Sequence, residues 1–343
     1  MAEDVIRDTG AGEDRVVVVD RRPLWQRIAK WVAIVLLGLV LLLVVVVLGL
    51  NTRPGQGFLV RQINNFSTAS GLKVHVGRIE GSLYGAMVIH DLELRDPKGV
   101  FASSPQVAVD WRPFAFARSH VDVRSLTSPL IRYDRNPQLL PTPPSQDQGP
   151  LLPDYDIDVN KLSVGRLEIG PAVAGQRYIA KIDGQAHIAD RRAQIQANAG
   201  TIAGGGLAGG DRLVLRLDAV PDDNKLDVDL RVTAPSNGLV AGLAGLKAPL
   251  VLNVDGRGAW SDWRGRAAGT LGGQPLVDLN VLGRSGNFQV RGFARPGLYL
   301  EGPVERLTAP RLQIALDTAL DERVVDAKLR LRSDALSVAT DGK

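Results

Sequence analysis

Histidines are the residues of this chain best suited to chemistry, because a neutral imidazole binds metals and acts as a base near pH 7. The 343-residue sequence has four histidines and no cysteine. They are His75, His90, His120 and His187, and their spacing forms neither an HxxxH nor an HExxH motif. A metal site would require several distant segments to converge, so we expect strand or surface histidines and no metal.

Three shorter patterns resemble parts of catalytic motifs. The glycines at 204–209 have GxGxxG spacing, but residues 211–215 alternate as in a strand, whereas a dinucleotide fingerprint continues into a helix. The SxxK at 70–73 has no SDN or KTG companion. Aspartates two residues apart, such as Asp227 and Asp229, share the solvated side of a strand. We therefore predict no catalytic residues and no cofactor, and we expect the chain not to be an enzyme.

The composition favours a protein of many short strands. Hydrophobic residues make up 45% of the chain but aromatic residues only 5%, with 37 Gly and 20 Pro. The 41 Lys and Arg against 37 Asp and Glu leave a net charge of +4, and the two signs interleave along the chain without a basic block. We therefore expect no nucleic-acid partner.

One long apolar segment lies near the amino terminus. Trp31 to Leu50 contains no charged residue, and a helix of this length, at about 1.5 Å per residue, spans the roughly 30 Å hydrocarbon core of a bilayer. A cleaved signal peptide is the alternative, but the segment is too long and has no small-x-small cleavage site. We predict a transmembrane anchor over 31–50, along which lie Trp31, Leu36, Leu41, Val46 and Leu50.

Lysine and arginine residues set the expected orientation of this anchor. They are more frequent in residues 1–30 than just after the span, and such an excess stays on the cytoplasmic side. We expect a cytoplasmic tail over 1–30, with everything after the anchor translocated. Residues 51–70 follow as a juxtamembrane helix with Leu59, Ile63 and Phe66 on one side, although a plain capping helix explains this pattern equally well.

Before residue 71 the hydrophobic residues recur with a period of about 3.6. From residue 71 to residue 343 the period is 2, which is typical of strands. At 178–188, for example, Ile182 and Ile188 fall on one side of a strand and Lys181 on the other. Turn sequences separate such runs at 96–99, 221–224 and 283–286.

Two segments depart from the strand pattern. Residues 236–246 are predicted as a second short helix, and six prolines at 137–153 predict an extended loop or spacer, with a domain boundary there as the alternative. The whole pattern predicts a mainly β protein. We expect a long, curled antiparallel sheet over 71–343, with one or two short helices, after the membrane anchor.

A sheet of this length must cover its apolar side, and few helices are available to do so. Either the sheet folds face to face as a sandwich or barrel, or it curls into an elongated groove that stays accessible. Small aliphatic residues on the inward side favour the groove. Its natural guest is an acyl chain, because exposing roughly 16 carbons to water costs about 13 kcal/mol. The predicted lining residues are Val74, Val76, Val107, Val109, Ile182, Ile188, Ile195, Leu213, Leu215, Leu217, Leu226, Val228 and Leu230.

Several motifs are similar to the amino-terminal region of the TamB family, part of the AsmA-like, bridge-like lipid transfer superfamily. They follow the apolar segment in the order GLKV at 71–74, IEGSLYG at 79–85, IHDLEL at 89–94, DPKG at 96–99, VAVDWRP at 107–113, LPDY at 152–155 and AWSDWRG at 259–265. The resemblance extends from about Trp25 to the last residue. Members of the family continue into a distinct carboxy-terminal domain, so we expect this chain to be an amino-terminal portion.

The resemblance implies a β-taco groove in the Gram-negative periplasm, anchored in the inner membrane, that carries phospholipids between the inner and outer membranes without catalysis. It also implies a TamA-like outer-membrane barrel as partner, bound through the carboxy-terminal region that this chain lacks. An assembly factor that holds nascent outer-membrane strands by strand addition is the alternative function. A purely structural, membrane-tethered sandwich is a third.

Overall fold

The computed structural model describes residues 48–140, 156–189, 192–321 and 324–342. The chain divides into two units, Met1–Gly49 and Leu50–Lys343. Outside the described ranges lie the predicted tail 1–30 and most of the predicted anchor, with Trp31, Leu36, Leu41 and Val46. Residues 48–50 are helical. Within the described ranges, no helix combines the length and the hydropathy needed to cross a bilayer.

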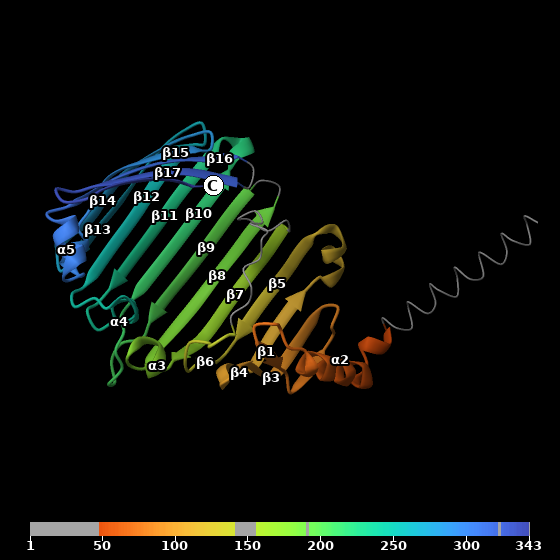
Figure 1. The fold of residues 1–343 in the computed structure, drawn as a ribbon. Coiled ribbons are helices and arrows are strands. Elements are labelled where there is room, and N and C mark those ends of the chain that lie inside the picture. Colours follow the sequence, from red (N-terminus) through yellow and green to blue (C-terminus); the bar gives the residue numbers. More distant parts are fainter. Residues whose placement is uncertain (1–47, 141–155, 190–191, 322–323, 343) are drawn as a thin grey trace, which may run out of the picture. The chain divides into compact units, whose positions relative to one another are not determined.

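The described strands form one 18-stranded sheet (Figure 1). Its first strands are β1 (Lys73–His75), β2 (Arg78–Gly81), β3 (Ala86–Asp96), β4 (Gly99–Trp111), β5 (His120–Ser128) and β6 (Ile131–Tyr133). Both β1 and β2 pair with β3, which pairs with β4. On its other side β4 pairs with β5 and with β6, which run in the same direction.

From β7 onward, each strand pairs in antiparallel fashion with the next one along the chain. These strands are β7 (Asp156–Ile169), β8 (Tyr178–Ala189), β9 (Arg192–Thr201), β10 (Arg212–Val220), β11 (Lys225–Ala234), β12 (Leu250–Ala259), β13 (Asp262–Leu271), β14 (Gln274–Arg284), β15 (Asn287–Ala294), β16 (Leu312–Asp321), β17 (Val324–Arg332) and β18 (Ser337–Gly342). The mainly β prediction is therefore confirmed.

One pairing contradicts the prediction of an entirely antiparallel sheet. β7 runs parallel to β5 and β6, with Asp156 opposite His120. Parallel strands need a long crossover instead of a hairpin, and the proline-rich segment 137–153 falls in this connection. Because β6 and β7 pair in the same sheet, the segment does not separate two domains. Residues 137–140 have no regular structure, and 141–155 lie outside the described part.

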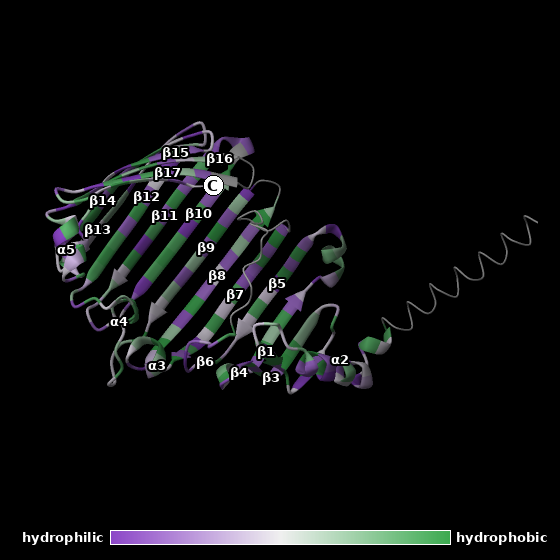
Figure 2. Ribbon diagram, viewed as in Figure 1, coloured by the Kyte–Doolittle hydropathy of each residue, from purple (hydrophilic) through white to green (hydrophobic). Residues whose placement is uncertain are grey.

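The alternation of residue types explains why these segments are strands. Figure 2 shows hydrophobic and hydrophilic residues alternating along β7 to β12, as expected when successive side chains point to opposite faces. The predicted turns are also confirmed: Asn224 and Ser285, with φ of 53° and 48°, supply left-handed residues in two of them. The glycines at 204–209 lie in the loop before β10, so their spacing marks no dinucleotide fingerprint.

The two ends of the strands differ in how they are connected. At one end, called the capped end, short helices join the strands (Figure 1): α3 (Pro171–Ala174), α4 (Leu239–Ala244), η3 (Pro296–Leu298) and α5 (Pro303–Thr308). The opposite end, called the turn end, has short turns, including η2 (Pro221–Asp223), and η1 (Pro113–Arg118) between β4 and β5. The predicted helix at 236–246 is α4, but the other short helices were not anticipated.

The predicted helix within 51–70 is confirmed as α2 (Arg53–Asn65). Gln56 and Val60 are its buried residues, whereas Phe66, placed on the apolar side by sequence, is 66% exposed. Gln56 donates a 2.7 Å hydrogen bond to the carbonyl of Gly81 at the end of the edge strand β2. α2 thus satisfies a backbone carbonyl at the edge of the sheet.

The hydrophobic core lies at the capped end. Tyr178, which is 1% exposed, packs there with Ile169 and Ala174, and the partly buried Leu239 of α4 packs against this cluster. A second cluster is built on Ala241, Leu246 and Leu271. The short helices thus seal one end of the sheet.

Candidate functional site

The strand register aligns apolar side chains into a continuous face. Leu215 of β10 lies opposite Leu230 of β11 and Ala197 of β9. Extending these pairings along the sheet gives one row, the apolar row, which contains Met87, Val109, Leu126, Leu162, Gly184, Ala197, Leu215, Leu230, Val254, Ala267, Leu279, Gly292, Ile314, Leu331 and Val338. It runs from β3 to β18 without a polar side chain. At about 4.8 Å per strand, it measures about 65 Å along the sheet.

We call the side of the sheet that carries this row the apolar face. Register places nearly all of the predicted lining residues on it. These are Val74, Val107, Val109, Ile182, Ile188, Ile195, Leu213, Leu215, Leu217, Leu226, Val228 and Leu230. Alternation therefore identifies the same face as the register, and pairing extends it to strands that contain no predicted lining residue.

Val76 is the exception. It follows β1 instead of belonging to a strand, and only 3% of it is exposed. Its backbone N–H donates to Asn64 Oδ1 at 2.8 Å, and its carbonyl accepts from Asn64 Nδ2 at 3.0 Å. The backbone of Val76 is thus bound to α2, outside the strand pairings that define the apolar face. The strand ends one residue earlier than alternation indicated.

Accessibility distinguishes the centre of the apolar face from its ends. No residue of the apolar row is buried: all are half-buried except Val338, which is exposed. At the capped end, by contrast, Ile169, Ala234 and Leu271 are buried. A second layer packed over the sheet would bury the middle row first. The described part of the chain therefore leaves the centre of this face accessible.

Trp263 covers part of the apolar face near the turn end. Its ring lies over Gly256 of β12 and Gly265 of β13, so that a Cβ atom on either glycine would overlap it. Phe288 meets the ring edge-on at a centroid distance of 6.3 Å. In the sequence Trp263 stands out only as part of the AWSDWRG motif, because the glycines are recognisable as its partners only from the register.

The opposite side, called the polar face, carries interleaved charges. Arg266 donates hydrogen bonds of 2.8 and 2.7 Å to the two carboxylate oxygens of Asp278, and these bonds lower the pKa of Asp278. Asp229, predicted to lie on the solvated side of its strand, is bound by Arg231 at 2.9 Å. Such pairs keep this side hydrated and do little else.

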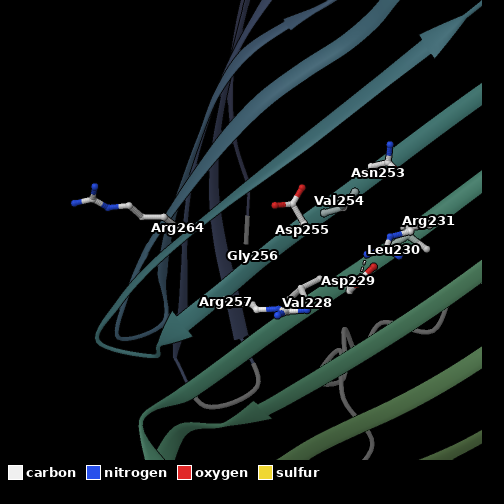
Figure 3. A pocket seen from close by; sticks show the side chains of 10 residues that line it. All are labelled: Val228, Asp229, Leu230, Arg231, Asn253, Val254, Asp255, Gly256, Arg257 and Arg264. Carbon is white, nitrogen blue, oxygen red and sulfur yellow. Dashed lines mark hydrogen bonds and ion pairs between the residues drawn. The ribbon is translucent and has the colours of Figure 1, made fainter.

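A shallow hollow of about 550 Å³ lies over β11 to β13, lined mainly by residues of the polar face. Figure 3 shows Arg264 pointing away from Arg257 and Asp255, which lie on the neighbouring strand. Charged groups that diverge in this way do not surround a common ligand position.

Two histidines that are distant in sequence meet in the structure. Asp158 of β7 binds His120 Nε2 at 2.8 Å through one carboxylate oxygen and His187 Nδ1 through the other. The parallel β5–β7 pairing brings His120 to Asp158, and the antiparallel β7–β8 pairing places His187 opposite it; no sequence pattern anticipated this meeting. Among the described residues, no group of three or more His, Asp or Glu has an arrangement that could hold a metal. The cluster is a hydrogen-bonded bridge between three strands.

The fold and its faces define a class of protein: a single, large, mainly β sheet with one accessible apolar face. Comparison with known proteins finds no matching family model, no matching curated protein and no matching solved structure.

Proposed function

We propose that this protein shields the acyl chains of phospholipids on its apolar face and carries them between membranes. The single observation behind this proposal is the apolar row, which is continuous from β3 to β18 and nowhere buried. Shielding a chain of roughly 16 carbons offsets about 13 kcal/mol of exposure to water. The charged groups of a phospholipid would stay in water beyond the hydrocarbon contact.

The proposal extends to location and partner. The apolar segment 31–50 would anchor the chain in the inner membrane of a Gram-negative cell, with residues 1–30 in the cytoplasm and 71–343 in the periplasm. The resemblance to the TamB family supports a TamA-like outer-membrane barrel as partner. The proposed transfer requires no catalytic residue, cofactor or metal, since it depends on the apolar face alone.

A carboxylate on the apolar face tests the proposal. Leu215→Asp in β10 and Val228→Asp in β11 place a charge on that face. Val214→Asp, also in β10, places the same charge on the polar face and is the control. With the full chain in nanodiscs, we expect both inward variants to lose most photocrosslinking to a phospholipid carrying a photoactivatable acyl chain. Val214→Asp should retain it. Equal crosslinking by all variants would refute acyl-chain binding on this face.

One observation favours a second function. Among the described strands β2 pairs only with β3, so its outer edge has backbone groups able to pair with another strand. An assembly factor for outer-membrane proteins would use such an edge. A photoreactive amino acid at Leu230 separates the two functions, because lipid adducts support transport and adducts to outer-membrane proteins support assembly.

A further inference from the structure

Two exposed aromatic side chains mark the turn end of the sheet between β4 and β5. The connection η1 has the sequence PFAFAR, and Phe114 and Phe116 are 67% and 54% exposed. No residue of η1 is buried. Burying a Phe side chain is favourable, so two of them left exposed on one short loop form a surface suited to an apolar environment.

Hydrogen bonds and stacking fix this loop beside the point where the chain leaves the predicted anchor. Asn51 directly follows Leu50, and its side-chain oxygen accepts a 2.9 Å hydrogen bond from the backbone of Leu83. The next residue, Tyr84, stacks on Phe114 with ring centroids 5.5 Å apart and planes 18° from parallel. The ring of Phe114 is thus connected, through Tyr84 and Leu83, to the residue that follows the apolar segment.

Positive charge accompanies the exposed rings. Arg118 is in the last turn of η1, is exposed, and forms no ion pair with any residue in the described part of the chain. Arg112, just before η1, binds Asp122 at 2.8 Å but keeps 62% of its side chain exposed. Aromatic rings beside arginines suit the interface of a bilayer, where rings lie at headgroup depth and cations approach anionic lipids.

We propose that Phe114, Phe116, Arg112 and Arg118 form a docking surface for an anionic bilayer. This inference rests on one part of the proposed function, the membrane anchor, because residues 31–50 must enter the bilayer on which the surface docks. The docking surface then holds the turn end of β4 and β5 against the headgroups, so that the sheet meets the membrane at a defined place instead of hanging from a free linker. A membrane-protein partner on these rings is the competing outcome.

The absence of cysteine from the sequence allows a specific test. Full-length chains carrying Phe114→Cys or Phe116→Cys are labelled with an environment-sensitive fluorophore and reconstituted in vesicles of phosphatidylethanolamine and phosphatidylglycerol. The matched control is Leu243→Cys, an exposed site in α4 at the capped end. Strands of ten residues such as β11 separate the two ends by about 30 Å.

The measurement is the quenching of each fluorophore by lipids that carry a spin label close to the headgroup. We expect several-fold stronger quenching at positions 114 and 116 than at 243, and weaker quenching at 114 when Arg118→Glu is added. Quenching at 114 and 116 no stronger than at 243 would overturn the docking surface. Shielding of the two labels from water without quenching by lipid would indicate a protein partner. That result would also overturn the docking surface.

The same samples separate this inference from the proposed function. Vesicle flotation reports whether the apolar segment anchors the chain, and acyl-chain crosslinking at the apolar face reports lipid binding. A chain that floats and crosslinks lipid while positions 114 and 116 stay unquenched leaves the proposed function standing and refutes only the docking surface. Because Phe114 stacks on Tyr84, the Phe116 label and thermal melting guard against a local folding defect.

Discussion

The indole ring of Trp263 lies directly against Gly256, its diagonal neighbour on the adjacent strand β12, in a space that any side chain on that glycine would fill. This contact closes part of the apolar face near the turn end. The centre of the same face remains accessible, so the two regions should respond differently to substitution.

Gly256→Ala should destabilise the protein by about 1–3 kcal/mol, because the new methyl group overlaps the ring and forces it to move. Chemical unfolding measures the change. Gly85→Ala is the control, since a Cβ there meets nothing within 4 Å. If the overlap is the cause, Gly256→Ala should cost much less in a Trp263→Leu background. An unchanged cost in that background would contradict the contact.

The accessible centre of the apolar face predicts unequal costs for equal truncations. Leu271→Ala removes a buried core side chain and should cost about 2–5 kcal/mol. Leu215→Ala removes a half-buried one and should cost about 1 kcal/mol. Urea unfolding of both variants checks this difference. Equal, large losses would mean that the face is sealed and would weaken the lipid proposal.

Asp211 should be a strong stabilising residue although it is far from α4 in sequence. Its carboxylate accepts hydrogen bonds from the backbone of Leu239 at 2.7 Å and Val240 at 3.1 Å, at the start of α4. Asp211→Ala leaves these donors unsatisfied and should cost about 2 kcal/mol in thermal or chemical unfolding. Asp262→Ala, at an exposed site, should be near neutral. A neutral Asp211→Ala would exclude a capping role.

Acid should weaken the attachment between the β3–β4 turn and the segment after β6. Arg135 binds the buried carboxylate of Asp96 with two bonds of 2.6 Å, and these hydrogen bonds lower the pKa of Asp96. The folded chain therefore keeps Asp96 ionised at a pH where the unfolded chain, with a pKa of about 3.9, takes up a proton.

The stability that Asp96 contributes should thus be complete above about pH 5 and decline as the pH falls below about 4. Urea unfolding from neutral to acidic pH measures this decline. Asp96→Asn should be less stable than the parent at neutral pH, and the difference should shrink on acidification. A difference that is constant with pH would show that the charge of Asp96 does not stabilise the fold.

The strands were predictable because alternation is a local property. Ile182 and Lys181 reveal by type alone that they occupy opposite sides of β8, and the turn residues Asn224 and Ser285 lie in predicted turns. The predicted lining residues follow from the same pattern. Val76 shows the limit of the method, since the strand ended one position before the pattern did and Asn64 bound its backbone instead.

By itself the sequence determined that most of the described residues after 71 form strands with one apolar and one polar side, because the period of two depends only on neighbouring residues. Only the tertiary structure decided the parallel pairing of β5 with β7, the meeting of His120 and His187 at Asp158, and the contact of Trp263 with Gly256. These features depend on which distant strands share backbone hydrogen bonds. That choice is made by the pairing of the whole sheet and leaves no local pattern in the chain.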